Sequence, residues 1–169
     1  MKLLSKLMER LGRKRTIYDR DGKIPYLIRY YVFLKNRKHF PFNITLHKVL
    51  VGDEPTLHDH PWNYATLILK GGYWEHIPVY SQEGNVVGST RKWRGPGHFR
   101  YRKADDLHWL ELAKDKDGND IPCWSLFYMG RKQKEWGFLP FNTKGELEER
   151  GYRWVHNEDY LGIGAKHGD

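Results

Sequence analysis

Two histidines, His58 and His60, stand in the sequence with a single residue between them. Side chains at positions i and i+2 of a β-strand point to the same face, so two imidazoles at this spacing can bind one metal ion. His108 follows much later, in a second segment whose pattern is typical of a strand. Three neutral imidazoles around a divalent cation leave open coordination positions, as in catalytic metal sites. These residues predict a centre that polarises a bound oxygen atom or activates water or dioxygen.

Five residues separate Gly52 from His58, Gly71 follows the histidine pair, and His108 stands eleven positions after Gly97. These spacings resemble the two sequence signatures of the cupin superfamily. The resemblance covers roughly residues 52–112 and implies a double-stranded β-helix, which is a jelly-roll barrel with its metal ligands inside. It also implies that two copies of the chain pair as a homodimer. The motif HDHPW…LKGGYWE further resembles small cupin proteins of phages and proteobacteria. The positions that carry the resemblance are Gly52, His58, His60, Gly71, Gly97 and His108.

The carboxylate that the resemblance implies as a fourth metal ligand is missing, because Tyr64 stands in its place. The second signature also departs from the family, with Lys103 and Asp105 where a proline and a glycine are expected. Three-His sites are known in cupin-like thiol dioxygenases, so metal binding by His58, His60 and His108 is compatible with the resemblance. A cupin that has lost its metal is the alternative.

No other acidic residue is expected to replace that carboxylate. Asp59 should point away from its flanking histidines, because side chains alternate along a strand. Glu75 follows the Gly71-Gly72 turn and is expected to reach only the rim of the barrel. Asp105 and Asp106 are expected to form a solvated turn near His108, with a role in orienting its imidazole as the alternative.

Several further residues are candidates for catalysis or substrate binding. The Tyr64 phenol could bond a metal-bound water or the substrate, with barrel packing as the alternative. Arg29 interrupts an apolar segment, where burial is costly unless the guanidinium is paired. It could bind a substrate carboxylate or phosphate through two hydrogen bonds, or form a structural ion pair. The substrate-binding candidates at the barrel mouth are Trp62, Asn63, Arg131 and Trp136, with core filling or a surface hairpin as the alternatives.

Short segments rich in aromatic and β-branched residues alternate with turn residues, which predicts an all-β barrel. Leucines at helical spacing predict a short amphipathic helix in residues 1–15, which would cap the barrel or, less expectedly, contact a membrane surface. Residues 16–169 would form a single cupin-like barrel domain with a C-terminal extension. Residues 143–150 look helical, because Thr143 and Glu146 match a capping box. The predicted strands cover residues 25–34, 44–51, 64–70, 73–80, 86–93, 99–102, 108–112 and 123–129.

The composition narrows the class of protein further. Aromatic residues make up 15 % of the 169 residues, which is too many for a disordered chain. The net charge of +8 fits either a solvated surface or a patch that faces a polyanion such as nucleic acid. The single cysteine, Cys123, excludes an intramolecular disulfide and a cysteine-based zinc site. No apolar run could span a membrane, and no secretory signal is visible, so we expect a cytoplasmic protein, in the host cytoplasm if the gene is viral.

These observations predict a metal-dependent cupin enzyme, an oxygenase that binds a small molecule in its barrel. The metal could be Fe, Mn, Zn or Ni, because three imidazoles suit each of them. Iron would suit dioxygen chemistry, whereas zinc or manganese would suit an isomerase or a hydrolase. Two alternatives belong to other classes: a non-catalytic cupin module that binds a ligand or nucleic acid, and a structural or assembly component of a virion.

Overall fold

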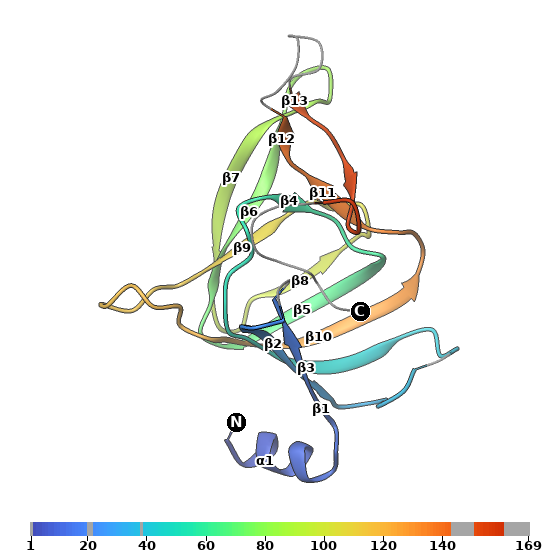
Figure 1. The fold of residues 1–169 in the computed structure, drawn as a ribbon, viewed down its shortest axis with the longest axis vertical. Helices are drawn as coiled ribbons and strands as arrows, with labels where there is room; N and C mark the ends of the chain where they lie inside the picture. The colour runs from blue at the N-terminus through green and yellow to red at the C-terminus, as the bar shows by residue number, and fades with distance from the viewer. Residues whose placement is uncertain (1, 20–21, 38, 143–150, 161–169) are drawn as a thin grey trace.

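Antiparallel β-strands dominate the computed structural model of the chain (Figure 1), which describes residues 2–19, 22–37, 39–142 and 151–160. The helix expected at residues 143–150, with its capping box of Thr143 and Glu146, lies outside the described residues. The all-β, jelly-roll architecture predicted from the sequence is confirmed. Within the described residues, no helix has the length and apolar character needed to cross a membrane.

One wall of the barrel is a six-stranded sheet with the order β1-β2-β3-β10-β5-β8. All five neighbouring pairs in this sheet are antiparallel. The strands are rich in aromatic and β-branched residues, whose side chains pack well on a pleated surface. Their bounds are Lys14–Tyr18 for β1, Pro25–Tyr31 for β2, Asn43–Val49 for β3, Cys123–Lys132 for β10, Trp62–Lys70 for β5 and Phe99–Arg102 for β8.

Smaller sheets complete the barrel. The sheet β7-β6-β9 is built on a long hairpin, and the sheet β14-β11-β4 joins the C-terminal part of the chain to the segment that carries His58. The pair β12-β13 extends beside the end of that hairpin in Figure 1. The bounds are Val86–Arg94 for β7, Tyr73–Tyr80 for β6, Trp109–Leu112 for β9, Val155–His156 for β14, Gly137–Leu139 for β11, Leu57–His58 for β4, Phe141–Asn142 for β12 and Gly151–Tyr152 for β13.

The inner face of the six-stranded sheet changes from apolar to polar along the barrel. Strand pairing aligns Arg29, His47 and Ser125 on neighbouring strands, and all three line the barrel cavity. The polar row therefore faces inward, next to an apolar cluster in the same barrel. That cluster comprises Ile17, Leu27, Val49, Ile68, Tyr73, Leu112 and Cys123.

The short N-terminal helix predicted from the sequence is confirmed. Helix α1 spans Lys2–Arg10, within the segment 1–15 that carries the amphipathic pattern. Gly12 has a φ of +61°, a left-handed conformation that glycine adopts without steric cost and that ends the helix. Lys14 already belongs to β1, because residues 14–18 form backbone hydrogen bonds with β2 instead of continuing the helix.

The segment around the histidine pair also differs from the expectation of one continuous strand. Strand β4 ends at His58, and His60 lies in the extended segment that follows it. The backbone N–H of His60 donates to the carbonyl of Ala104, at 3.1 Å, which keeps this segment beside the loop that precedes His108.

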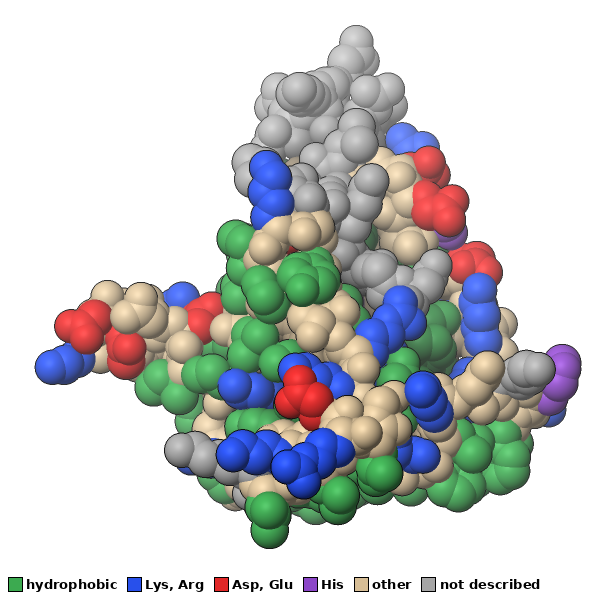
Figure 2. Space-filling model, turned by 60° about the horizontal axis from the view of Figure 1, so that its bottom comes forward, with side chains coloured by type: hydrophobic (Ala, Val, Ile, Leu, Met, Phe, Trp, Pro, Cys, Tyr) green, Lys and Arg blue, Asp and Glu red, His purple; other side chains and the backbone are tan. Residues whose placement is uncertain are grey.

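Basic side chains are spread over the molecule. Figure 2 shows Lys and Arg on the lower face in several separate groups, divided by hydrophobic and other side chains. The homodimer and the nucleic-acid partner predicted from the sequence stay predictions.

Candidate metal centre

The three histidines converge inside the barrel, as the sequence predicts. His58 and His108 face each other across an antiparallel bridge, with N–H···O=C distances of 2.9 and 3.0 Å in the two directions. The ring centroids of His58 lie 5.3 Å from His60 and 5.1 Å from His108, and those of His60 and His108 lie 5.1 Å apart. One nitrogen of each ring lies within 4.8 Å of the other two. A single ion could therefore contact all three rings.

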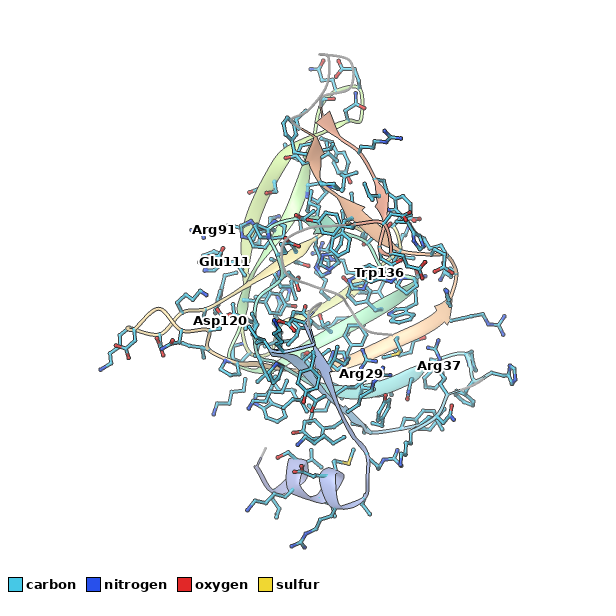
Figure 3. The ribbon with its side chains drawn as sticks, viewed as in Figure 1. Arg29, Arg37, Arg91, Glu111, Asp120 and Trp136 are labelled. Atoms are coloured by element: carbon cyan, nitrogen blue, oxygen red, sulfur yellow. The ribbon has the colours of Figure 1, made fainter. Side chains whose placement is uncertain are left out.

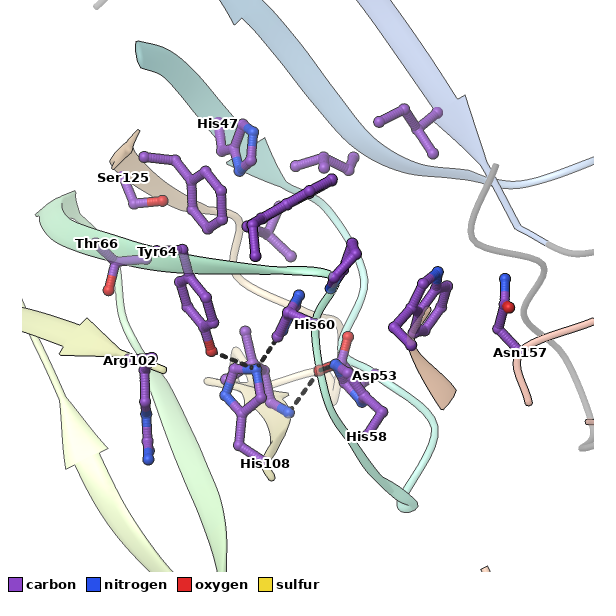
Figure 4. A pocket seen from close by; sticks show the side chains of 18 of the residues that line it. His47, Asp53, His58, His60, Tyr64, Thr66, Arg102, His108, Ser125 and Asn157 are labelled. Atoms are coloured by element: carbon purple, nitrogen blue, oxygen red, sulfur yellow. Dashed lines mark hydrogen bonds and ion pairs between the residues drawn. The ribbon is translucent and has the colours of Figure 1, made fainter. Parts of the chain in front are cut away.

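The donor atoms fit a divalent cation. Nε2 of His60 lies 2.9 Å from Nε2 of His108, and the Tyr64 hydroxyl lies 2.9 Å from the same His108 nitrogen (Figure 4). Two imidazole lone pairs at this separation repel each other unless a proton or a cation lies between them. Histidine nitrogens are preferred ligands of divalent transition metals, and these side chains are mostly buried.

Glu75 lies beside His108 in the interior, and the expectation that it reaches only the rim is wrong. Its side chain is buried, and Oε1 lies 3.3 Å from His108 Nδ1. A carboxylate at Nδ1 favours a proton there and leaves the Nε2 lone pair toward the centre. The turn explains the position: Gly71 has a φ of +78°, and a Cβ there would meet the Pro122 carbonyl oxygen at 2.6 Å. This tight turn sends β6 to the opposite sheet, where Glu75 faces inward.

Two arginines complete the environment of Glu75. Arg94 Nε donates to Oε2 at 2.8 Å, and Arg102 Nε donates to Oε1 at 3.1 Å. Burial by itself raises the pKa of the Glu75 carboxyl, but His108 and Arg102 outweigh it and hold that pKa well below its usual range. The carboxylate is therefore charged and paired.

A second acidic residue, Asp53, supports the other side of the cluster, and the sequence analysis missed it. Its Oδ2 lies 3.9 Å from His58 Nε2 and accepts a hydrogen bond from the backbone N–H of Leu110, at 2.7 Å. The Tyr26 hydroxyl donates to the other carboxylate oxygen. Burial, reinforced by Asp53, raises the pKa of Tyr26 well above its usual value. Asp53 follows Gly52 in a turn-like sequence, which gave no signal of an inward carboxylate.

Other acidic residues near the histidines act elsewhere. Asp59 points away from the cluster, as alternation predicts, and accepts hydrogen bonds from the Gly137 N–H at 2.7 Å and from Trp154 Nε1 at 3.1 Å. Asp106 accepts from the backbone N–H of Lys103, at 2.9 Å, within its turn. The carboxylate beside the His108 imidazole is therefore that of Glu75, not one of the turn aspartates.

The histidines open into a cavity of about 660 Å³. Tyr64, Trp62, Trp136 and Arg29 line this cavity, and Figure 3 shows Trp136 and Arg29 at well-separated positions. Burial raises the pKa of Tyr64 well above its usual value, so its hydroxyl is a hydrogen-bond donor. The Trp136 ring lies 6.3 Å from the ring of His58, measured between centroids.

Two of the predicted substrate-binding residues lie away from this cavity. The Asn63 side chain accepts a hydrogen bond from the backbone N–H of Ala104, at 2.8 Å, because alternation along β5 turns it away from the side that Tyr64 faces. Arg131 is exposed and is not part of the cavity wall formed by the described residues. Lys132, its neighbour, lines the cavity instead.

A jelly-roll barrel with three inward histidines is the architecture of a cupin, and comparison with solved structures supports a cupin fold. The polyketide cyclase RemF from Streptomyces resistomycificus matches with a TM-score of 0.50 and 14 % identity, over 70 % of this chain and 74 % of that chain. A cupin-2 domain protein from Rhodospirillum rubrum matches with a TM-score of 0.50 and 13 % identity, over 73 % and 72 % of the two chains. No family model matches the sequence, and neither does any curated protein. The chain therefore has a cupin-like fold.

Proposed function

We propose that this protein is a metal-dependent cupin enzyme, an oxygenase that acts on a small molecule bound in the barrel. The observation that supports the proposal is the convergence of His58, His60 and His108 at one end of a cavity large enough for a substrate. No carboxylate joins the three rings as a ligand within the cluster formed by the described residues. An all-imidazole set leaves the positive charge of a divalent ion uncompensated, which favours the binding of an anionic or polarisable oxygen ligand.

The three histidines would hold the ion, and their neighbours orient two of the rings. Glu75 contacts Nδ1 of His108 at 3.3 Å, and the Thr56 carbonyl oxygen lies 3.4 Å from Nδ1 of His58. Partners of this kind raise the basicity of the coordinating nitrogen and restrict ring rotation. A bound divalent transition metal supplies a Lewis-acidic centre with open positions for substrate and, in the case of iron, for dioxygen.

Tyr64 positions a hydroxyl at the same centre. Its oxygen lies 2.9 Å from Nε2 of His108, which is the nitrogen that the cation would use. With His108 Nε2 engaged by a cation, the Tyr64 hydroxyl would be available to donate to an oxygen atom of the substrate. The Phe127 ring stacks on the Tyr64 ring, with centroids 5.3 Å apart, and so helps to orient the phenol.

Metal and small-molecule probes test this proposal. Protein purified without oxygen and titrated with Fe(II) should bind a single equivalent, and addition of nitric oxide should then produce the electron paramagnetic resonance signal of a high-spin iron nitrosyl. That signal requires an open coordination position. His39→Ala, a change at an exposed histidine, is the control and should leave both results unchanged.

The outcomes separate the enzyme from its alternatives. An iron-bound protein that gives no nitrosyl signal would contradict the oxygenase proposal, because the site would be closed. A protein that binds no transition metal would contradict metal dependence altogether and favour a non-catalytic cupin module.

A further inference from the structure

In the part of the chain that the structure describes, Arg29 lacks the acidic partner that two other cations of the cavity lining have. Arg102 is paired with Glu75, and Lys132 is paired with Glu135. Among the described residues, no Asp or Glu oxygen lies within ion-pair distance of Arg29. The structural ion pair that the sequence analysis left open as an alternative for Arg29 is thus not found in this part of the chain.

The Arg29 guanidinium is held in place by a neutral partner. Its Nε donates to Nε2 of His47, at 3.1 Å, and the Thr45 hydroxyl lies 3.0 Å from the same nitrogen. Burial, with Arg29 as the second cause, holds the pKa of His47 well below its usual value, so the imidazole accepts this hydrogen bond as the neutral form. This hydrogen bond uses one of the five guanidinium N–H groups, and the Tyr31 side chain is a further hydrogen-bond partner of Arg29. Together the two contacts orient the guanidinium.

An uncompensated guanidinium in a cavity is costly, because burial penalises the charged form and lowers the pKa of Arg29. Arginine remains charged at neutral pH, so it presents a lasting positive field to the cavity. A planar fork of this type binds a carboxylate or a phosphoryl group through two parallel hydrogen bonds.

Aromatic rings connect this position to the histidine cluster. The His47 ring stacks on Phe127, with centroids 4.5 Å apart, and Phe127 stacks on Tyr64, at 5.3 Å. In Figure 4, His47 and Ser125 lie on the far side of Tyr64 from His108. The stacked rings of Phe127 and Tyr64 thus lie between the Arg29 end of the cavity and the histidine end. Near the histidines, the buried Glu75 carboxylate already balances the charge of Arg94 and Arg102, whereas no carboxylate among the described residues is paired with Arg29.

We propose that Arg29 binds the anionic group of the substrate, and that the substrate is a small acid with a ring-containing body that lies along Phe127 and Tyr64. This assignment rests on the proposed function for the reacting end, since that end would reach the histidines. The anion-binding subsite itself needs no metal, so the two proposals can fail separately.

Binding of simple aromatic probes to the full-length protein tests the subsite. Calorimetry or ligand-observed NMR would compare benzoate and phenylphosphonate with benzamide, a neutral analogue of benzoate. Benzoate or phenylphosphonate should bind at least about tenfold more tightly than benzamide, since a charge-assisted hydrogen bond contributes about 1.5–3 kcal/mol. The stronger of the two anions identifies the substrate as a carboxylate or as a phosphoryl compound.

Variants locate the anion. Arg29→Met should weaken the preferred anion about tenfold or more without changing benzamide binding, and Arg29→Lys should recover only part of the loss. Arg100→Met is the matched control, because Arg100 also lines the cavity without an acidic partner among the described residues, and it should leave anion binding within about threefold. Thermal unfolding of each variant checks that it folds.

The His60→Ala variant distinguishes anion binding at Arg29 from anion binding at the histidines. Anion binding that persists in metal-free His60→Ala supports the Arg29 subsite, whatever the metal measurements show. Loss of anion binding in His60→Ala with retention in Arg29→Met would overturn the inference, because the anion would then bind at the histidines. Loss in Arg100→Met alone, or equal binding of benzoate, phenylphosphonate and benzamide to the unmodified protein, would overturn it as well.

Discussion

The two ends of the barrel cavity handle buried charge in opposite ways. At the histidine end, the Glu75 carboxylate is surrounded by Arg94, Arg102 and His108. At the other end, the side-chain hydrogen-bond partners of Arg29 are His47 and Tyr31, and no carboxylate among the described residues pairs with it. The charges around Glu75 are paired with one another, whereas the Arg29 guanidinium keeps hydrogen-bond donors available to a ligand.

This difference indicates that the paired charges around Glu75 support the fold, whereas the charge of Arg29 serves ligand binding. Removal of one partner from a closed buried network leaves the others uncompensated and lowers stability strongly. Removal of an uncompensated charge relieves a desolvation cost and leaves stability little changed or higher. Residues of the second kind are retained in spite of their cost, which is common where function and stability conflict. The variants below compare the two ends in these terms.

The largest effect is expected from loss of a metal ligand. His60→Ala should weaken binding of Fe(II) or Zn(II) by more than about 100-fold, which exceeds the loss typical of partners that only orient a ligand. Competition with a fluorescent chelator measures the affinity. Stability should be largely retained, because the buried charges around Glu75 are balanced by Arg94, Arg102 and His108. An affinity equal to that of the His39→Ala control would show that the metal binds elsewhere.

Glu75→Gln should affect both stability and metal binding. The free energy of unfolding should fall by about 3 kcal/mol, because Arg94 and Arg102 lose their buried countercharge. Metal affinity should fall about 10- to 100-fold, because His108 loses the carboxylate at Nδ1. Denaturant unfolding and metal competition report the two effects.

Glu111→Gln provides the matched control on the neighbouring strand. Glu111 pairs with His76 at 2.8 Å and with Arg91 at 3.3 Å, but its side chain is 35 % exposed. A partly exposed pair contributes little, so the loss should stay below about 1 kcal/mol. Equal losses from the two glutamate variants would contradict the closed network around Glu75.

The pH dependence of stability should report His47. Its pKa is lowered in the folded state, so between that pKa and about 6.5 the unfolded chain binds a proton that the folded protein does not. The stabilisation is therefore complete above pH 6.5 and decreases as the pH falls below it, by up to about 1.4 kcal/mol per pH unit. Denaturant unfolding at several pH values should show a smaller slope in His47→Gln than in the unmodified protein.

The smallest effect on stability is expected from Arg29→Met, in contrast to its effect on anion binding. The apolar side chain fills a similar volume without a desolvated charge, so the free energy of unfolding should change by less than about 1 kcal/mol or increase. A loss as large as that of Glu75→Gln would instead assign Arg29 to the support of the fold.

Most of the barrel and the three-His cluster could be predicted from the sequence. The strands of the six-stranded sheet other than β1, and those of the β6–β7 hairpin, have strong local patterns, with turn residues between them. Strand β1 was not predicted, because its first residues follow the N-terminal amphipathic pattern. The histidine pair could be predicted because side chains at positions i and i+2 of a strand, such as His58 and His60, point to the same face. Arg29 was recognised as unusual because a charged residue interrupts an apolar strand.

The partners of these residues could not be predicted, because they depend on how distant strands are brought together. Glu75 faces His108 only because the Gly71 turn sends β6 into the opposite sheet, and Asp53 lies in a segment that reads as an ordinary turn. The short strands β11 and β14 have two or three residues each, too few for a periodic pattern. Strand β11 forms because it pairs with β4 beside Asp59, and β14 forms because it pairs with β11.

Anomalous scattering from a crystal of metal-loaded protein tests the central claim most directly. Data collected on both sides of the absorption edge of the added metal should give one strong difference peak at the histidine end of the cavity. That peak should lie about 2.0–2.2 Å from a ring nitrogen of each of His58, His60 and His108. A peak at any other position, or its absence from a crystal grown with saturating metal, would contradict the assignment of these histidines as a metal centre.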